Sequence, residues 1–221
     1  MFRVTRNFMS ALMYGNMNRT TGRSHLMDKY AYGTPTTNRF LKTLQANYAQ
    51  NSVSAYQNIK DKADALQASA AKLTAQGEDS LFEKAKETGD TSGITAQIKE
   101  FVEQYNNMVR NLKGSGDRLN SAYADSLNTY AVMHRNVLKG TGVSQQTDGT
   151  LKLDEGALRE ASLEALERAW GGSSSFASKA ATTASLASAN AVSNINSKMS
   201  NSYSNLLRNY GSSGNYFNYW R

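Results

Sequence analysis

The sequence predicts a mainly α-helical protein: an elongated long-helix hairpin or coiled-coil bundle with a small β-hairpin and terminal coiled-coil segments. Three observations predict it. Apolar residues recur at alternating spacings of three and four, which keeps one helix face apolar. The only proline is Pro35, and interior prolines break helices. Asp148-Gly149 precedes a strand-like alternation, as in a β-hairpin. We expect an N-terminal segment at 1–37, a helical domain at 38–172 with the hairpin near 143–153, and a C-terminal helix with an aromatic tail at 173–221.

Composition narrows the classes of function. The chain has 221 residues, of which 39% are hydrophobic, and it has no cysteine, which excludes disulfides and cysteine-ligated metals. The net charge is +7, and the positive charge lies at the two ends while the middle is net negative. No apolar run approaches the roughly 18 to 20 residues of a membrane span, and the short stretch Phe8 to Tyr14 lacks a cleavage site. We therefore expect no membrane insertion and, if the protein leaves the cell, export without a cleaved signal peptide.

The first long helix is predicted at residues 38–76. Asn38 is its expected N-cap, and Gly77 is a typical C-terminal signal. Residues 1–34 before it offer only a weak apolar face, so we expect them to order against a partner. The helix presents one apolar face at spacings of three and four, formed by Tyr56, Ile59, Ala63, Leu66, Ala70 and Leu73.

The second long helix carries the longest apolar stripe of the chain. A polar connector at 77–93, with a short helical turn near 81–86, predicts an antiparallel pair of helices. Gly114 and Gly116 interrupt the stripe, yet its spacing resumes seven residues after Leu112, so we expect it to run unbroken. Its positions are Ile94, Ile98, Phe101, Tyr105, Met108, Leu112, Leu119, Tyr123, Ser126, Tyr130, Met133 and Val137. We expect Ile98, Phe101, Tyr105, Met108 and Leu112 to pack against Tyr56, Ile59, Leu66 and Leu73.

In the last third of the chain the spacing of the apolar residues changes twice, from helical to strand-like and back to helical. Val143 precedes the Asp-Gly turn, and Leu151 and Leu153 alternate with Lys152 as in a strand. Asp154 is the expected cap of a helix from Glu155 to about Trp170, which buries Leu158, Leu163 and Leu166. After Gly171 and Gly172 a helix at 173–210 places Ala177, Ala184, Ala191, Ile195, Met199 and Leu206 on one face. Such small residues bury little area, so this helix needs neighbours.

The residues that could carry chemistry are few. His134 has no acidic residue four positions before or after it, and His25 lies in the weak N-terminal segment, so neither shows the converging ligands that a metal site or a catalytic triad needs. Asp148, Asp154 and Glu155 lack the alternating oxygen ligands of a calcium loop, so we interpret them as a turn and a helix N-cap. The glycines match no phosphate-binding loop. We expect no catalytic, cofactor-binding or metal-binding residues, and no enzyme.

Apolar and aromatic residues near both ends predict a subunit interface. Aromatic side chains with a polar tip suit protein interfaces, and left bare they lower solubility. The expected interface residues are Phe8, Leu12, Ile195, Met199, Leu206, Tyr210, Phe217 and Trp220. Deleting residues 1–34 or 177–221 is therefore expected to abolish assembly and to leave a folded, helical monomer.

Two motifs resemble a known family. Residues 101–109 read FVEQYNNMV, and Gly142-Val143 is followed by DGTLKLDE at 148–155 and by Leu158. In order and spacing this resembles the C-terminal part of the flagellar filament-cap (hook-associated protein 2) family. The N-terminus, with Arg3-Val4-Thr5, Asn7 and Ser10-Ala11-Leu12, is similar to flagellins and the hook–filament junction protein. The resemblance implies that 1–37 and 173–221 are axial-core segments and that the long helices and the hairpin form the next layer.

The resemblance implies a structural, self-assembling component of the bacterial flagellar filament axis, outside the cell. It is most like a minimal filament-cap protein, because residues 77–93 stand where the family inserts its outer β domains. A reduced flagellin or a hook–filament junction subunit, and a secreted helical adhesin or effector, are alternatives. Basic ends that bind nucleic acid are a third hypothesis, which predicts strong salt dependence. We expect the partners to be copies of the chain and other flagellar axial proteins, with an export chaperone as a further candidate, and no nucleic acid.

Overall fold

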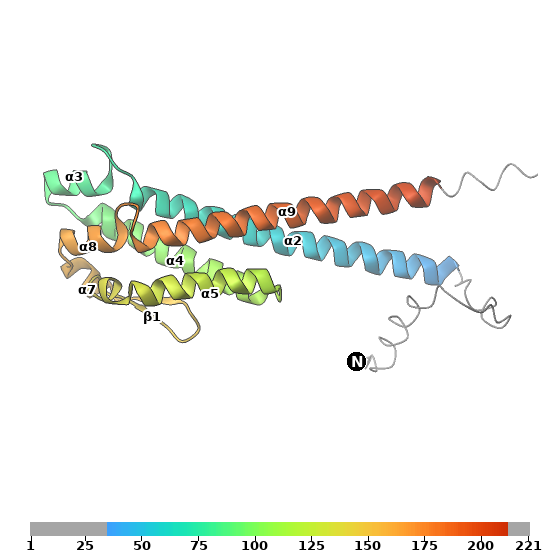
Figure 1. The fold of residues 1–221 in the computed structure, drawn as a ribbon, viewed down its shortest axis with the longest axis horizontal. Coiled ribbons are helices and arrows are strands. Elements are labelled where there is room, and N and C mark those ends of the chain that lie inside the picture. Colours follow the sequence, from blue (N-terminus) through green and yellow to red (C-terminus); the bar gives the residue numbers. More distant parts are fainter. Residues whose placement is uncertain (1–34, 212–221) are drawn as a thin grey trace, which may run out of the picture. The chain divides into compact units, whose positions relative to one another are not determined.

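The computed structural model describes the backbone of residues 35–211 and the side chains of residues 50–201. Helices hold 77% of the described residues, in eight helices, together with one two-stranded antiparallel sheet, so the mainly α fold with a small β-hairpin is confirmed (Figure 1). The chain divides into two compact units, 1–46 and 47–221, and the packing below is that of the second. The elements in chain order are α2 (Pro35–Thr74), α3 (Leu81–Thr88), α4 (Ser92–Gly114), α5 (Arg118–Met133), α6 (Arg135–Lys139), β1 (Val143–Gln145), β2 (Leu151–Leu153), α7 (Glu155–Glu160), α8 (Leu163–Trp170) and α9 (Phe176–Gly211).

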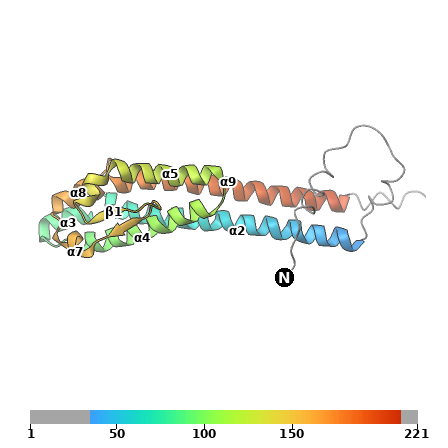
Figure 2. The same ribbon diagram turned by 90° about the horizontal axis from the view of Figure 1, so that it is seen from below.

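Four long helices of the second unit share one hydrophobic core. Figure 2 shows α5 with α9 in one layer and α4 with α2 in the other. The elements α3, α7, α8 and the hairpin gather at one end of these helices, as both views show. Each of these elements contributes buried apolar side chains to the core, among them Leu66, Phe82, Leu127, Leu158 and Ala184. Burial of this kind supplies most of the stability of a helical fold.

An aromatic cluster joins α4, α8 and α9. The ring centroids of Phe101 and Trp170 lie 5.3 Å apart, those of Trp170 and Phe176 5.8 Å, and those of Tyr105 and Phe176 5.5 Å. Phe101 and Phe176 both meet Trp170 edge-on, an arrangement worth about 0.5–1.5 kcal/mol beyond the buried area. The indole Nε1 of Trp170 donates a hydrogen bond to Thr141 Oγ1 at 3.1 Å, which satisfies its one polar atom.

Two helix boundaries differ from those expected, and the residues at the helix starts explain why. Helix α2 begins at Pro35 rather than after Asn38, because proline suits the first turn of a helix, where its missing N–H costs nothing. The helix expected from Glu155 to Trp170 is two helices. Ser162 takes an extended conformation and its Oγ accepts a hydrogen bond from Ala165 N at 3.3 Å, which ends α7 and starts α8. The short helix expected near 81–86 is α3.

The long apolar stripe is not continuous, so that expectation is wrong. Its first half, on α4, is buried, but residues 115–117 form a turn in which Gly116 has φ +67°. Asp117 then caps α5 through hydrogen bonds from Leu119 N and Asn120 N. The turn rotates the second helix about its axis, so α5 buries a different face, made of Asn120, Ala124, Leu127 and Ala131.

The expected hairpin is present and is fixed to α4. Strands β1 and β2 pair Val143 with Leu153 and Gln145 with Leu151. Asn106 of α4 holds the outer edge of β2, since its Nδ2 donates to Leu151 O at 2.8 Å and its Oδ1 accepts from Leu151 N at 2.7 Å. The side chain thus replaces a neighbouring strand at this position.

Gly142 allows the hairpin to lie against α7. It has φ +75°, and a Cβ there would lie 2.7 Å from Asp154 O and 2.9 Å from Leu158 N. Its carbonyl accepts a hydrogen bond from Asp154 N at 2.8 Å. No other residue type fits both the conformation and the space.

Candidate assembly surface

The residues expected to hold the first two long helices together lie in the core. Ile59, Leu66, Leu73, Ile98, Phe101, Tyr105, Met108 and Leu112 are buried, and Tyr56 is half-buried against them. Polar contacts reinforce the pair of helices. Gln97 Nε2 of α4 donates to Ser69 Oγ of α2 at 2.9 Å, and Lys72 and Glu100 form an exposed ion pair at 3.3 Å.

The first half of α9 belongs to the same core. Its buried apolar row consists of Phe176, Ala177, Ala180, Ala184, Ala187 and Ala191. Ser188 Oγ donates to Asp64 Oδ1 of α2 at 2.6 Å, and Asn190 Nδ2 donates to Asn120 Oδ1 of α5 at 3.4 Å. The expectation that residues 177–221 can be deleted from a folded monomer is therefore wrong, because this deletion removes one helix of the core.

After Ala191 the apolar residues of α9 lie on a different face of the helix. Continuing the alanine row by helical spacing leads to Asn194 and Lys198, which are polar. Apolar residues lie instead on the neighbouring stripe, about a quarter turn away at 3.6 residues per turn. On that stripe Val192 is 37% exposed and Met199 is 59% exposed, while Ile195 is half-buried. The change occurs where α5 begins, since Asn190 lies opposite Asn120.

The expected subunit-interface residues are placed only in part. Ile195 and Met199 lie on the new stripe of α9. Leu206 and Tyr210 fall within α9, but their side chains lie outside the described residues. Phe8, Leu12, Phe217 and Trp220 lie outside the described residues altogether, and so does His25.

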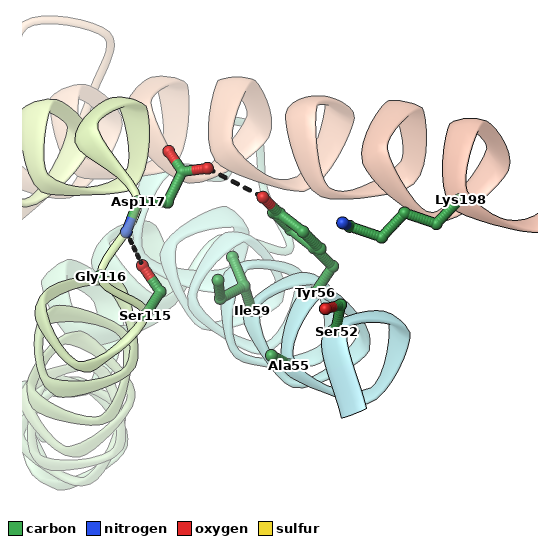
Figure 3. A pocket seen from close by; sticks show the side chains of 8 residues that line it. All are labelled: Ser52, Ala55, Tyr56, Ile59, Ser115, Gly116, Asp117 and Lys198. Carbon is green, nitrogen blue, oxygen red and sulfur yellow. Dashed lines mark hydrogen bonds between the residues drawn. The ribbon is translucent and has the colours of Figure 1, made fainter. Parts of the chain in front are cut away.

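A pocket of about 240 Å³ lies at the corner where α5 begins, between α2 and α9 (Figure 3). Its lining comes from α2, from the turn before α5 and from α9. Tyr56 Oη donates to Asp117 Oδ2 at 2.8 Å, and Lys198 Nζ lies 5.9 Å from the centre of the Tyr56 ring. The lining residues are Ser52, Ala55, Tyr56, Ile59, Ser115, Gly116, Asp117 and Lys198.

The polar groups of the pocket tie three helices together. Asp117 caps α5 with one oxygen and accepts the Tyr56 hydroxyl with the other. The Tyr56 hydroxyl above all, then the backbone N–H groups of Asn120 and Leu119 and the charge of Lys198, hold the pKa of Asp117 below its usual range, against the opposing effect of burial. Figure 3 shows Tyr56 between Asp117 and Lys198, so the corner is a joint between α2, α5 and α9.

Sequence reasoning did not find this corner. Tyr56 and Asp117 are 61 residues apart, and neither has a motif around it. One signal was present: an aspartate directly after Gly-Ser-Gly and three residues before Asn120 is a typical N-cap. It would have shown where α5 begins, and hence that the long stripe is interrupted.

The histidine and the carboxylates considered for chemistry have structural positions. His134 lies between α5 and α6, where its ring nitrogens lie 2.8 Å from Tyr130 O and 3.4 Å from Ser174 O. Asp148 accepts from Thr150 within the hairpin turn, and Asp154 caps α7 through Gly156 N and Ala157 N, as expected. Glu155 pairs with Lys99 at 2.6 Å. Within residues 50–201, no three histidine, aspartate or glutamate side chains are grouped to hold a metal ion.

Comparisons with known proteins leave the chain without an assigned family. No protein-family model matches it, and neither a curated protein nor a solved structure matches it. Among the described helices, none has the length and apolar character to cross a membrane.

Proposed function

We propose that the chain is a structural, self-assembling component of the bacterial flagellar filament axis. It is most like a minimal filament-cap protein without outer β domains. The proposal rests on one observation: after Ala191 the apolar residues of α9 lie on a different face of the helix. A helix that buries alanines against its own bundle up to Ala191, and then presents Val192 and Met199 outwards, has a second surface for a different neighbour.

The residues that carry the family resemblance also support the proposal. In the structure they contact one another. Asn106 of the FVEQYNNMV segment binds Leu151 of the DGTLKLDE segment, and Gly142 lies against Asp154 and Leu158. The two motifs therefore describe one structural unit, a long helix with a docked hairpin and a following short helix. The resemblance implies a layer of this kind around the core that the terminal axial segments form.

In this proposal the long helices extend as a coiled-coil hairpin, and the terminal segments pair with those of neighbouring subunits. Segments that bury little surface alone become ordered when a neighbour supplies the rest of the core. Assembly then stabilises the termini by mass action, so their order depends on protein concentration. Packing, and not catalysis, performs the function.

Light scattering of truncated chains tests the assembly. We expect the full chain to gain mass with concentration, and chains lacking residues 1–34 or ending at Ser200 to stay monomeric with an intact helical signal. The chain that ends at Ser200 keeps the buried alanine row of α9, so we expect its core to stay folded. A full chain that stays monomeric at every concentration refutes self-assembly and favours a secreted adhesin or effector. A label at the ends of flagella, seen by immunogold microscopy, tests the location.

A further inference from the structure

The exposed apolar residues of α9 beyond Ala191 form one stripe along the helix. Val192 is 37% exposed, Met199 is 59% exposed, and Ile195 between them is half-buried. Val192 and Met199 are seven residues apart, so they lie within about 20° of each other around a helix of 3.6 residues per turn. We name Val192, Ile195 and Met199 the α9 stripe; in the sequence its spacing continues through Tyr203, Leu206 and Tyr210. A helix stripe of this spacing packs against other apolar side chains.

The sequence that follows α9 indicates a turn and then an aromatic segment. Helix α9 ends at Gly211, which opens the run Gly211-Ser212-Ser213-Gly214. Glycine and serine are typical turn residues, and a four-residue turn reverses the direction of the chain. Residues 216–220 read YFNYW, so four of these five side chains are aromatic. We name residues 216–220 the aromatic segment; the pattern indicates that it returns along the helix it follows.

The length of this segment matches the distance back to Met199. Met199 precedes Gly211 by twelve residues, which is about 18 Å of helix, and Val192 precedes it by nineteen residues, or about 28 Å. Trp220 follows Gly214 by six residues, and an extended chain of that length spans about 20 Å. A chain that reverses at residues 211–214 therefore brings Trp220 level with Met199, while Val192 lies beyond its span.

We propose that the aromatic segment folds back on its own α9 and that the Trp220 indole covers Met199 in the single subunit. A thioether against an indole ring is a favourable contact, and it removes both apolar groups from water. A short linker gives an effective concentration on the order of millimolar, so the chain's own segment covers Met199 in dilute solution. The inference goes beyond the proposed function: the segment is an autoinhibitory strap, and a neighbouring copy must displace it to cover the whole α9 stripe.

Acrylamide quenching of tryptophan fluorescence tests the strap in the full chain at concentrations where it is monomeric. The chain has two tryptophans, and Trp170 is fully buried, so the quencher in water reports on Trp220. We expect Trp220 to be protected in wild type, and Met199→Glu to remove the protection and shift the emission to longer wavelength. Val192→Glu is the matched control on the same stripe beyond the reach of Trp220, and Ser200→Glu adds the same charge at an exposed position beside Met199. Both controls should keep wild-type protection, and equal thermal melting of the variants shows that the fold is intact.

Dilution separates the chain's own segment from that of a second copy. Protection of Trp220 within one subunit is expected to stay the same at every concentration below assembly. Protection that disappears on dilution, or that Val192→Glu removes as fully as Met199→Glu, assigns the cover to a second copy and overturns the inference. So does a Trp220 that is open to the quencher in dilute wild type, or one whose protection survives Met199→Glu. A chain that protects Trp220 but never associates refutes the proposed function and leaves the strap standing.

Discussion

Replacing Asn106 by alanine tests how the hairpin is fixed to the bundle. The substitution removes two hydrogen bonds, at 2.8 and 2.7 Å, and leaves the N–H and C=O of the buried Leu151 without their side-chain partner. A net hydrogen bond contributes about 1 kcal/mol, and an abandoned buried group costs about 1–3 kcal/mol. We therefore expect the free energy of unfolding to fall by about 2–4 kcal/mol.

Urea unfolding at a concentration below that of assembly measures this loss. Asn107→Ala is the matched control, since Asn107 is half-buried beside it and is expected to cost no more than about 0.5 kcal/mol. Asn106→Asp gives a second signature: its carboxylate faces the Leu151 carbonyl, so stability should recover as the pH falls and the carboxyl group regains a proton. An Asn106→Ala chain as stable as the control refutes the role of Asn106.

Three further substitutions test the packing, each by urea unfolding unless stated. Gly142→Ala should cost at least about 2 kcal/mol more than Gly116→Ala, because both glycines have positive φ but only Gly142 is enclosed by backbone atoms. Tyr105→Phe should stabilise the fold by about 1 kcal/mol, because the buried hydroxyl has no hydrogen-bond partner in the described structure. Burial also raises the pKa of Tyr105, so wild-type stability should fall as the pH rises above 10.0, the ordinary tyrosine value, where the unfolded chain loses this proton first. Tyr56→Phe should raise the pKa of Asp117, measured by NMR titration. The stability that the lowered pKa confers in wild type is present above the ordinary value of 3.8 and is lost as the pH falls through the native value.

The sequence predicts the helices and the hairpin because their signals are local. The Asp-Gly pair at 148–149, the Asp154 cap and the apolar row of α4 need no information from distant residues. The apolar spacing of α2 also marks residues that are buried in the structure, among them Ile59, Leu66 and Leu73. The mainly α class with one small hairpin is thus recoverable from pattern and turn chemistry.

The second half of the long stripe shows why the packing of α5 could not be predicted from the sequence. Heptad spacing states that a face is apolar but does not state which neighbour covers it. The turn at 115–117 rotated α5, so the core took the small residues Ala124 and Ala131, and Leu119 and Met133 stayed exposed. The corner between Tyr56 and Asp117 likewise depends on the three-dimensional meeting of α2 and α5.

The central claim, that further copies of the chain cover the exposed apolar residues of α9 after Ala191, is tested most directly by sedimentation velocity of the full chain over a hundredfold range of concentration. We predict a sedimentation coefficient that rises with concentration, and a constant monomer value for the Met199→Glu chain. A wild-type chain that sediments as one monomeric species across the whole range would contradict the claim.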